Sequence, residues 1–256
     1  MDLGLAGRRA LVLGSSSGLG RAVAASLVAE GATVAVVSRD ADRADTTATA
    51  IGATAALGLD LTEPGAGIRV VDDAVAELGG LDVVVINTGG GPPGPLLSTD
   101  EAGTDVAYHS MLRPALEVAR AAAPHITANG DGRMVFLTAR SVVEATPELA
   151  LSSVFRSGVT AAARSLALEL APLATVNVVV TGQFDTPALH RFETARATHE
   201  GRPLAEVRAD HIASIPMGRL GEAHELADVV TFLCSPRSSF VTGTLVRVDG
   251  GAVRGF

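Results

Sequence analysis

Short runs of apolar, largely β-branched residues alternate along the chain with longer Ala- and Leu-rich stretches. Their apolar character is continuous, which is typical of strands that are buried on both faces. The stretches between them predict helices, one of which begins with LALSSVFRSGVT, residues 149–160. The runs that predict strands are residues 9–14, 32–38, 53–60, 81–87, 132–138, 174–180 and 244–250.

This alternation predicts the fold class. Parallel strands joined by right-handed helical crossovers give a doubly wound α/β sheet of about seven strands with helices on both faces. No linker or internal repeat divides the sequence, so we expect residues 1–256 to form a single domain. Residues 88–99 and about 183–215 look irregular, and both follow strand ends, where such sheets bind ligands. We expect a substrate lid at 183–215.

Composition narrows the classes of partner. The 256 residues carry a net charge of -8, which disfavours nucleic acid and anionic membranes because both need a basic surface. The N-terminus does not resemble a signal peptide, and no apolar stretch approaches the ~18 residues of a membrane span. The single cysteine, Cys234, allows no intrachain disulfide and is expected to be a buried small hydrophobe. We therefore expect a soluble, cytoplasmic protein.

The first predicted strand runs into a glycine-rich turn, GSSSGLG (14–20), which opens a helix. Gly14 permits a sharp turn, Gly18 lets the backbone approach a phosphate, and Gly20 lets the helix pack near the sheet. A purely structural turn would also explain these glycines. The preceding strand, the following helix and a second strand about twenty residues on favour a dinucleotide site.

The end of the second strand bears on the choice of cofactor. Ser38 stands where an NAD-preferring site carries an acid for the ribose 2′-hydroxyl. Arg39 follows, and its guanidinium is suited to pair with a 2′-phosphate. We therefore predict NADP(H) as the cofactor. The alternative for Arg39 is a solvated arginine at a strand end.

Several motifs, in order along nearly the whole chain, resemble the short-chain dehydrogenase/reductase family. GSSSGLG resembles its cofactor turn, GLDLTEP its adenine-contacting acid at Asp60, and NTGG (87–90) its Asn-Asn-Ala-Gly element. Thr186 is placed to meet the nicotinamide amide, and residues 215–251 follow the family's closing pattern. The resemblance implies a Rossmann-type fold and a homotetramer or homodimer, with residues 222–251 partly buried between subunits. The cofactor-binding residues it implies are Gly14, Ser16, Ser17, Gly18, Leu19, Gly20, Ser38, Arg39, Asp60, Leu61, Asn87, Gly89 and Thr186.

The catalytic positions depart from the family, which uses a Tyr-xxx-Lys pair, an upstream serine and an asparagine on the preceding helix. An ungapped alignment puts Ser152 at the tyrosine, Arg156 at the lysine and Ala139 at the serine. Met111 falls at the asparagine. Ser141 takes the place of the serine only if the intervening loop carries a two-residue shift.

Chemistry limits what this altered pair can do. Hydride delivery to a carbonyl generates an alkoxide, which must be protonated or held by positive charge. Serine is a far weaker acid than a phenol, and Arg156 stays protonated. We expect Arg156 to hold the nicotinamide ribose, as the family's lysine does, and to stabilise the oxyanion, and Ser152 to orient water or substrate. Alternatively, Ser152 and Arg156 have no catalytic role and only line a retained cofactor cleft.

The remaining candidates add little. Tyr108 either presents its phenol to the cleft or packs as an amphipathic residue. The histidines at 190, 199 and 211 match no metal-ligand spacing, so no metal is predicted. Two hypotheses follow. The first is an NADP(H)-dependent oxidoreductase with altered proton transfer, acting on a small or conjugated carbonyl compound. The second is an NADP-binding protein that has lost hydride transfer and has a regulatory, scaffolding or non-redox role.

Overall fold

A parallel sheet forms the centre of the computed structural model, which describes residues 2–254. Seven strands lie in the order β3-β2-β1-β4-β5-β6-β7, and every pairing is parallel. Both the seven predicted strands and the predicted α/β fold are confirmed. The strands are β1 (Arg9–Val12), β2 (Thr33–Ser38), β3 (Ala55–Gly58), β4 (Val83–Ile86), β5 (Gly132–Ala139), β6 (Ala174–Thr181) and β7 (Leu245–Val248).

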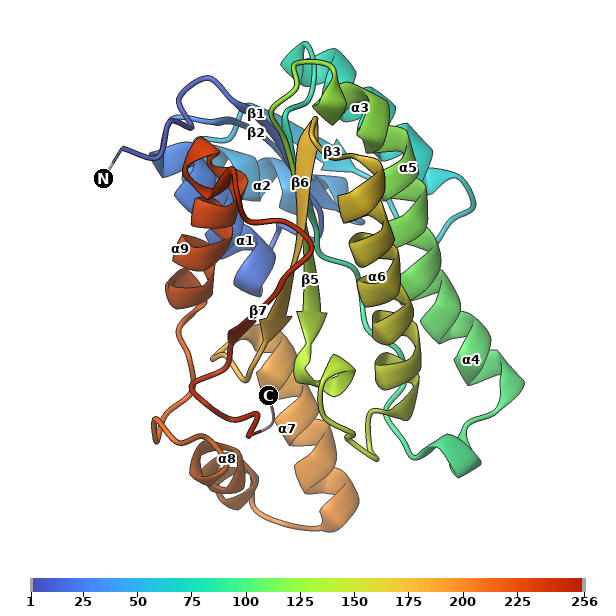
Figure 1. Ribbon diagram of the computed structural model, residues 1–256. Coiled ribbons are helices and arrows are strands. Elements are labelled where there is room, and N and C mark those ends of the chain that lie inside the picture. The colour runs from blue at the N-terminus through green and yellow to red at the C-terminus, as the bar shows by residue number, and fades with distance from the viewer. Residues whose placement is uncertain (1, 255–256) are drawn as a thin grey trace.

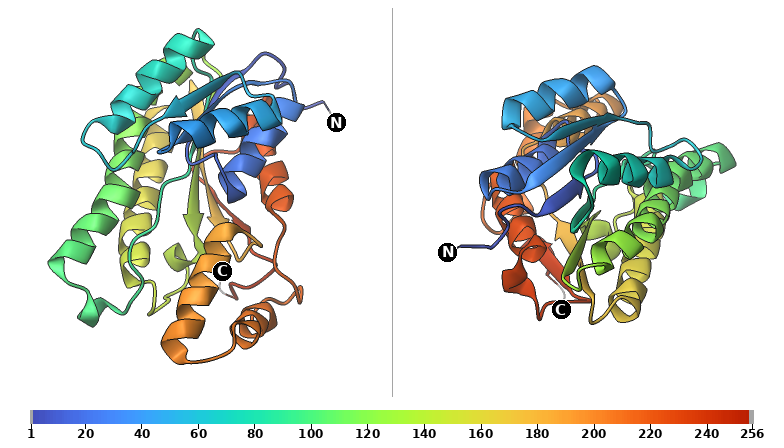
Figure 2. Two further views of the ribbon diagram at one scale, coloured as in Figure 1. Left: turned by 180° about the vertical axis from the view of Figure 1, so that it is seen from behind. Right: turned by 90° about the horizontal axis from the view of Figure 1, so that it is seen from above.

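Helices cover both faces of this sheet (Figures 1 and 2). One face carries α1 (Gly18–Ala29), α2 (Ala41–Ile51) and α9 (Ala223–Cys234). The other face carries α3 (Ala66–Leu78), α5 (Arg113–Thr127) and α6 (Ala150–Glu169). The short helix α4 (Glu101–Ala107) runs through a π-helical turn, Tyr108–Leu112, into α5.

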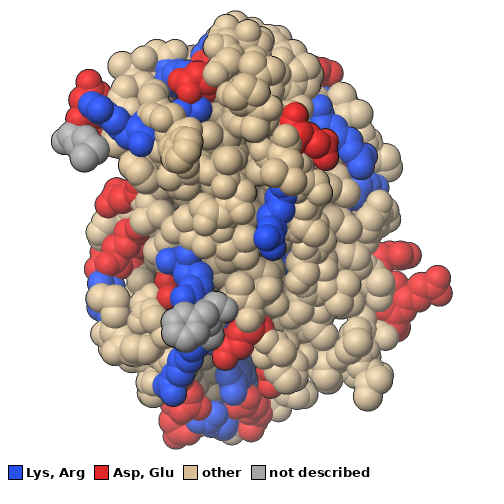
Figure 3. Space-filling view, viewed as in Figure 1, with Lys and Arg blue, Asp and Glu red and all other residues tan. Residues whose placement is uncertain are grey.

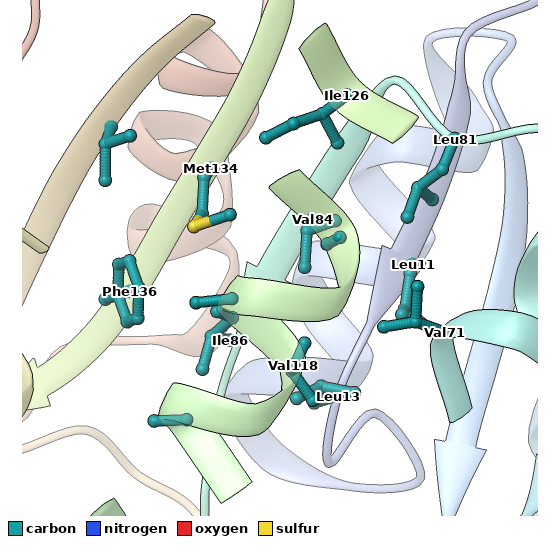
Figure 4. Close-up of a cluster of buried hydrophobic side chains, with 14 of the residues drawn as sticks. Leu11, Leu13, Val71, Leu81, Val84, Ile86, Val118, Ile126, Met134 and Phe136 are labelled. Carbon is teal, nitrogen blue, oxygen red and sulfur yellow. The ribbon is translucent and has the colours of Figure 1, made fainter. Parts of the chain in front are cut away.

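The continuous apolar runs are explained by these two layers. In β4, Val84 and Ile86 pack toward the layer that contains α3 and α5, whereas Val83 and Val85 pack toward the layer that contains α1 and α9. Figure 4 shows the first of these clusters, in which strand side chains meet Val118 of α5. Each residue of β4 is therefore buried whichever way it points, and no polar alternation is left in its sequence.

The segment 183–215 is helical, so the prediction that it is irregular was wrong. It contains α7 (Pro187–Glu200) and α8 (Leu204–Ala213), which lie beyond the carboxyl ends of β5 and β6 (Figure 1). The hydroxyl of Thr186 accepts the Leu189 N–H and so caps α7. Gly201 ends α7 in a left-handed conformation at φ 64°.

The segment 88–99 is largely irregular, as predicted, with one 3₁₀ turn at Leu96–Ser98. Cys234 is buried as expected, and burial raises the pKa of its thiol to about 12. Among residues 2–254, no helix combines the length and the apolar character that a membrane span needs. The same residues contain no cluster of three or more His, Cys, Asp or Glu side chains arranged to hold a metal ion.

Candidate functional site

The order of the strands reverses beside β1, whose neighbours are β2 and β4. The chain leaves β1 in one direction along the sheet and later returns to add β4 on the other side. This switch opens a crevice at the carboxyl ends of the strands, where doubly wound sheets bind nucleotides. The glycine-rich turn lies at this point, between β1 and α1.

The backbone of the glycine-rich turn needs glycine for two different reasons. Gly14 and Gly18 have positive φ values, 58° and 54°. At Gly20 the constraint is space, because a Cβ atom there would lie 2.3 Å from the Gly14 carbonyl oxygen and 2.9 Å from Nδ2 of Asn87. The close packing predicted for Gly20 is thus present in the structure.

The start of α1 fits a phosphate-bearing cofactor. The helix begins at Gly18, and within the described chain the Ser17 hydroxyl makes no capping hydrogen bond to it. The first N–H groups of α1 therefore have no side-chain acceptor, and the positive end of the helix dipole faces the turn. An unhindered cradle with free N–H donors is what a dinucleotide pyrophosphate requires.

Two predicted cofactor residues lie against this turn. Asn87, just after β4, donates from Nδ2 to the Gly14 carbonyl over 3.3 Å. Thr186, at the start of α7, lies 3.6 Å from the position that a Cβ at Gly18 would take. The fold thus brings together three segments that are far apart in sequence.

The remaining residues predicted for the turn and the adenine side have mixed environments. The Ser16 carbonyl accepts the Thr47 hydroxyl over 3.3 Å, and Leu19, the second residue of α1, packs partly against the core. Leu61 packs partly against the core on the opposite face of the sheet. Ser38 is buried, and its hydroxyl accepts the Asp40 N–H.

Arg39 and Asp60 lie close together at the ends of β2 and β3. Arg39 is exposed. Hydrogen bonds from the Thr62 N–H and hydroxyl lower the pKa of Asp60, and the nearby charge of Arg39 lowers it further. An exposed guanidinium therefore lies beside the predicted adenine-contacting acid. A positive charge at this place would distinguish a cofactor that carries a 2′-phosphate from one that does not.

The Arg156 side chain connects two segments of the chain beside the crevice. Its Nη2 donates to the Gly89 carbonyl over 2.9 Å, and its Nη1 donates to the Leu137 carbonyl over 3.4 Å. Burial of the guanidinium lowers the pKa of Arg156 to about 10, so the group still carries its charge at neutral pH. Two of its five N–H donors are used by these bonds. The side chain thus links the loop after β4 to the end of β5.

Ser141, and not Ala139, supplies the hydroxyl beside Ser152. The two Oγ atoms lie 3.3 Å apart, and Ser141 is buried in a 3₁₀ turn that follows β5. Ser141 therefore supplies a hydroxyl next to Ser152, whereas Ala139, which the ungapped alignment places at the family's serine, has none.

Met111 and Tyr108 do not complete a polar site. Met111 is fully buried and packs against Leu151. The Tyr108 ring lies 6.2 Å from that of Phe155, centroid to centroid, and Tyr108 is absent from the residues that line the cavity described next. The only tyrosine is therefore partly exposed, contacts the Phe155 ring and lies outside the cavity.

A cavity of about 1100 Å³ opens beside the hydroxyl pair. It reaches from Leu19 and Thr186 at the cofactor crevice, past Ala139 and Ser141, to the inner sides of α7 and α8. Its volume lies near the upper end of the range for small-molecule sites. The predicted lid segment thus forms one wall of it.

Sequence reasoning missed a buried acid–histidine pair in this wall. Glu193 of α7 is fully buried, and its Oε1 lies 2.9 Å from Nδ1 of His211 on α8. Arg208 approaches the other carboxylate oxygen at 3.3 Å, and the ring of Phe192 stacks on His211. The partners come from two helices that were not predicted, so no spacing along the chain could have revealed the pair.

The geometry agrees with comparisons to known proteins. A family model described as enoyl-(acyl carrier protein) reductase matches residues 14–253. The chain belongs to the short-chain dehydrogenase/reductase family. The predicted resemblance is therefore confirmed at the level of the family.

The relatives of this short-chain dehydrogenase/reductase are oxidoreductases. A 2-dehydro-3-deoxy-L-rhamnonate dehydrogenase (NAD(+)) of a Sphingomonas species is 31% identical over 96% of this chain and 95% of the relative. The cis-4-hydroxycyclohexanecarboxylate dehydrogenase of Sinomonas cyclohexanicum is 34% identical over 98% of both. The L-sorbose reductase of Gluconobacter frateurii, solved with NADPH and L-sorbose, is 25% identical with a TM-score of 0.93 over all of both chains.

Proposed function

We propose that this protein is an NADP(H)-dependent oxidoreductase that acts on a small or conjugated carbonyl compound through an altered proton-transfer arrangement. One observation carries the proposal. A single cavity is lined both by Leu19 and Thr186, at the cofactor crevice, and by Ser141, whose hydroxyl lies 3.3 Å from that of Ser152. A substrate in that cavity would contact the Ser141 hydroxyl and lie next to the predicted cofactor-binding residues. Membership of a family of oxidoreductases supports the same reading.

The preference for NADP(H) rests on the end of β2. Relatives include an enzyme named for NAD(+) and a reductase solved with NADPH, so the family leaves the choice open. Arg39 is exposed beside Asp60, and the buried Ser38 offers no carboxylate to a ribose 2′-hydroxyl. A guanidinium at this place favours a 2′-phosphate.

The dinucleotide would be held by the glycine-rich turn, by Asn87 and by Thr186. When bound, it supplies or accepts the hydride. Arg156 keeps the Gly89 loop fixed against β5 and has N–H donors left for the nicotinamide ribose. Its buried charge stabilises negative charge that develops on a substrate oxygen, an effect worth ~3 to 4 kcal/mol for a well-placed donor.

Ser141 and Ser152 orient the reacting oxygen. Each hydroxyl can donate one hydrogen bond, but neither is acidic enough to replace a phenol as proton donor. The preferred substrate should then give a product anion that is already stabilised, such as the enolate or phenolate formed from an enone, a quinone or a poly-keto aromatic compound. Water completes the protonation. Simple ketones should react slowly.

Single-turnover oxidation of bound NADPH tests the proposal. We expect a conjugated carbonyl substrate to oxidise NADPH stoichiometrically and a saturated ketone of similar size to do so at least tenfold more slowly. Faster reaction of the saturated ketone would refute the altered proton transfer. Tight NADPH binding with no oxidation by any enone, quinone or ketone would favour the alternative, a cofactor-binding protein without hydride transfer.

We also propose that the protein assembles into a homotetramer or homodimer through residues 222–251 and neighbouring helices. Large apolar side chains are exposed there, including Phe240 at 102%, Leu168 at 83% and Phe232 at 37%. The middle of the face formed by α6, α9 and β7 carries few charged side chains (Figure 3). Sedimentation at micromolar concentration should show a multimer, and a clean monomer would count against this assembly.

A further inference from the structure

An arginine lies directly beside the hydroxyl pair and has no role in the arrangement described so far. Arg140 is half-buried, and it follows β5 between Ala139 and Ser141. All three residues line the cavity. Arg140 therefore contributes to the cavity wall directly next to Ser141 along the chain.

Arg140 differs from the other arginine of the cavity in having no acidic partner. Arg196 is held by Glu200, with Nε 2.6 Å from the carboxylate. Across the described residues, the Arg140 side chain takes part in no hydrogen bond or ion pair. Its guanidinium is therefore available to an acidic group of a ligand that enters the cavity.

The other charged residues of the cavity also favour an anionic ligand beside Arg140 and Ser141. The acids Glu200 and Asp210 of the cavity are both paired with Arg202. Glu148 also lines the cavity but is exposed. Arg156 contributes a second positive charge near the end of β5, where it donates to the Leu137 carbonyl, but it does not line the cavity.

We propose that Arg140 binds a carboxylate of the substrate, which makes the preferred substrate an oxo acid whose carboxylate lies a few atoms from the reacting carbonyl. The inference rests on the proposed function for the position of that carbonyl. A planar guanidinium matches a carboxylate with two parallel hydrogen bonds, and one guanidinium balances its single charge. Bound in this way, the carboxylate would hold the carbonyl against Ser141 and Ser152.

Calorimetric titration with benzoate and benzamide tests the site without any turnover. These probes have nearly the same size and shape and differ in charge. With and without NADP⁺, we expect the parent protein to bind benzoate at least tenfold more tightly than benzamide. The Arg140→Gln variant should bind both equally, because it keeps a polar side chain but loses the charge, and its affinity for NADP⁺ should be unchanged.

A matched control removes one positive charge elsewhere. Arg164 is an exposed residue of α6 that does not line the cavity, so Arg164→Gln should retain the preference for benzoate. Equal binding of the two probes by the parent protein would overturn the inference, and so would a preference that survives Arg140→Gln or an equal loss in Arg164→Gln. Failure of NADPH oxidation, with the benzoate preference intact, would refute the proposed function alone.

Discussion

The two ends of the ligand crevice are built in different ways. At the cofactor end, the constraints fall on the backbone, as at Gly20, where even a single methyl group would meet a carbonyl oxygen. At the catalytic end, the constraints fall on side chains that meet across distant segments, such as Ser141 with Ser152 and Glu193 with His211. We therefore expect the glycine-rich turn of the first end to tolerate fewer substitutions than the side chains of the second end.

We propose that this contrast lets the chain keep its cofactor motifs while its catalytic pair differs from that of the family. From its place on α6, Arg156 finds two carbonyl acceptors, at Gly89 and Leu137. The predictions below test whether the cofactor end is in fact the less tolerant of the two.

The largest effect is expected at Gly20. Its replacement by alanine places a Cβ 2.3 Å from the Gly14 carbonyl oxygen, so either the turn or α1 must shift. We expect Gly20→Ala to lose about 3 kcal/mol of stability, as overpacked sites do, and to lose calorimetrically detectable NADP⁺ binding. Gly158→Ala in α6 is the control, because a Cβ at Gly158 meets only the methyl groups of Leu112, at 3.4 and 3.6 Å. Normal cofactor binding by Gly20→Ala would contradict the role of backbone packing.

The next largest effect is expected for Arg156→Ala. The substitution removes the hydrogen bonds to the Gly89 and Leu137 carbonyls together with a buried charge. We expect kcat/KM to fall about a hundredfold and NADPH to bind more weakly, because both the loop after β4 and the oxyanion lose support. Arg156→Lys should recover part of the activity. An unchanged kcat/KM in Arg156→Ala would show that the charge has no part in catalysis.

The same difference between backbone and side-chain constraints decides which parts of the structure could be predicted from the sequence. The strands and the glycine-rich turn could be predicted because their requirements are local: β-branched runs for burial on both faces and glycines for a tight turn. The helices α7 and α8 were missed because their residues, such as His190, Glu193 and Arg196, show no clear apolar face. They are held by caps, ion pairs, the Glu193–His211 contact and a small apolar cluster around Ile215, which only the folded chain assembles.

The position of Ser141 illustrates the same limit at the catalytic end. An alignment without gaps selected Ala139, and only the 3.3 Å distance between the Ser141 and Ser152 hydroxyls showed which residue faces α6. Loop length is not encoded in any local pattern, because a turn can absorb an added or missing residue without changing the strands and helices on either side.

A smaller effect is expected at Arg39, where the test concerns selectivity. Charge-assisted hydrogen bonds contribute roughly 1.5 to 3 kcal/mol, which corresponds to about 10- to 100-fold in affinity. The parent protein should bind NADPH more tightly than NADH by about this factor, and Arg39→Ala should remove most of the difference. Calorimetric titration with both cofactors measures it. Arg43→Ala is the control. It removes a different positive charge, on α2, and should leave the preference for NADPH over NADH unchanged. Equal affinities in the parent protein would overturn the assignment of NADP(H).

The smallest effect is expected for Ser152→Ala. If no proton passes through Ser152, its hydroxyl only orients the reacting oxygen, and Ser141 remains 3.3 Å away to share that task. We therefore expect kcat/KM to fall about tenfold or less, and the Ser141→Ala, Ser152→Ala double variant to fall by more than the product of the two single losses. Measuring kcat/KM with a conjugated and a saturated carbonyl substrate shows whether Ser152 donates a proton. Loss of a proton donor would slow the saturated substrate most. Loss of all activity in Ser152→Ala, with Arg156→Ala still active, would mean that the serine is the proton donor after all, and the catalytic end would then depend on a single side chain as strictly as the cofactor end depends on Gly20.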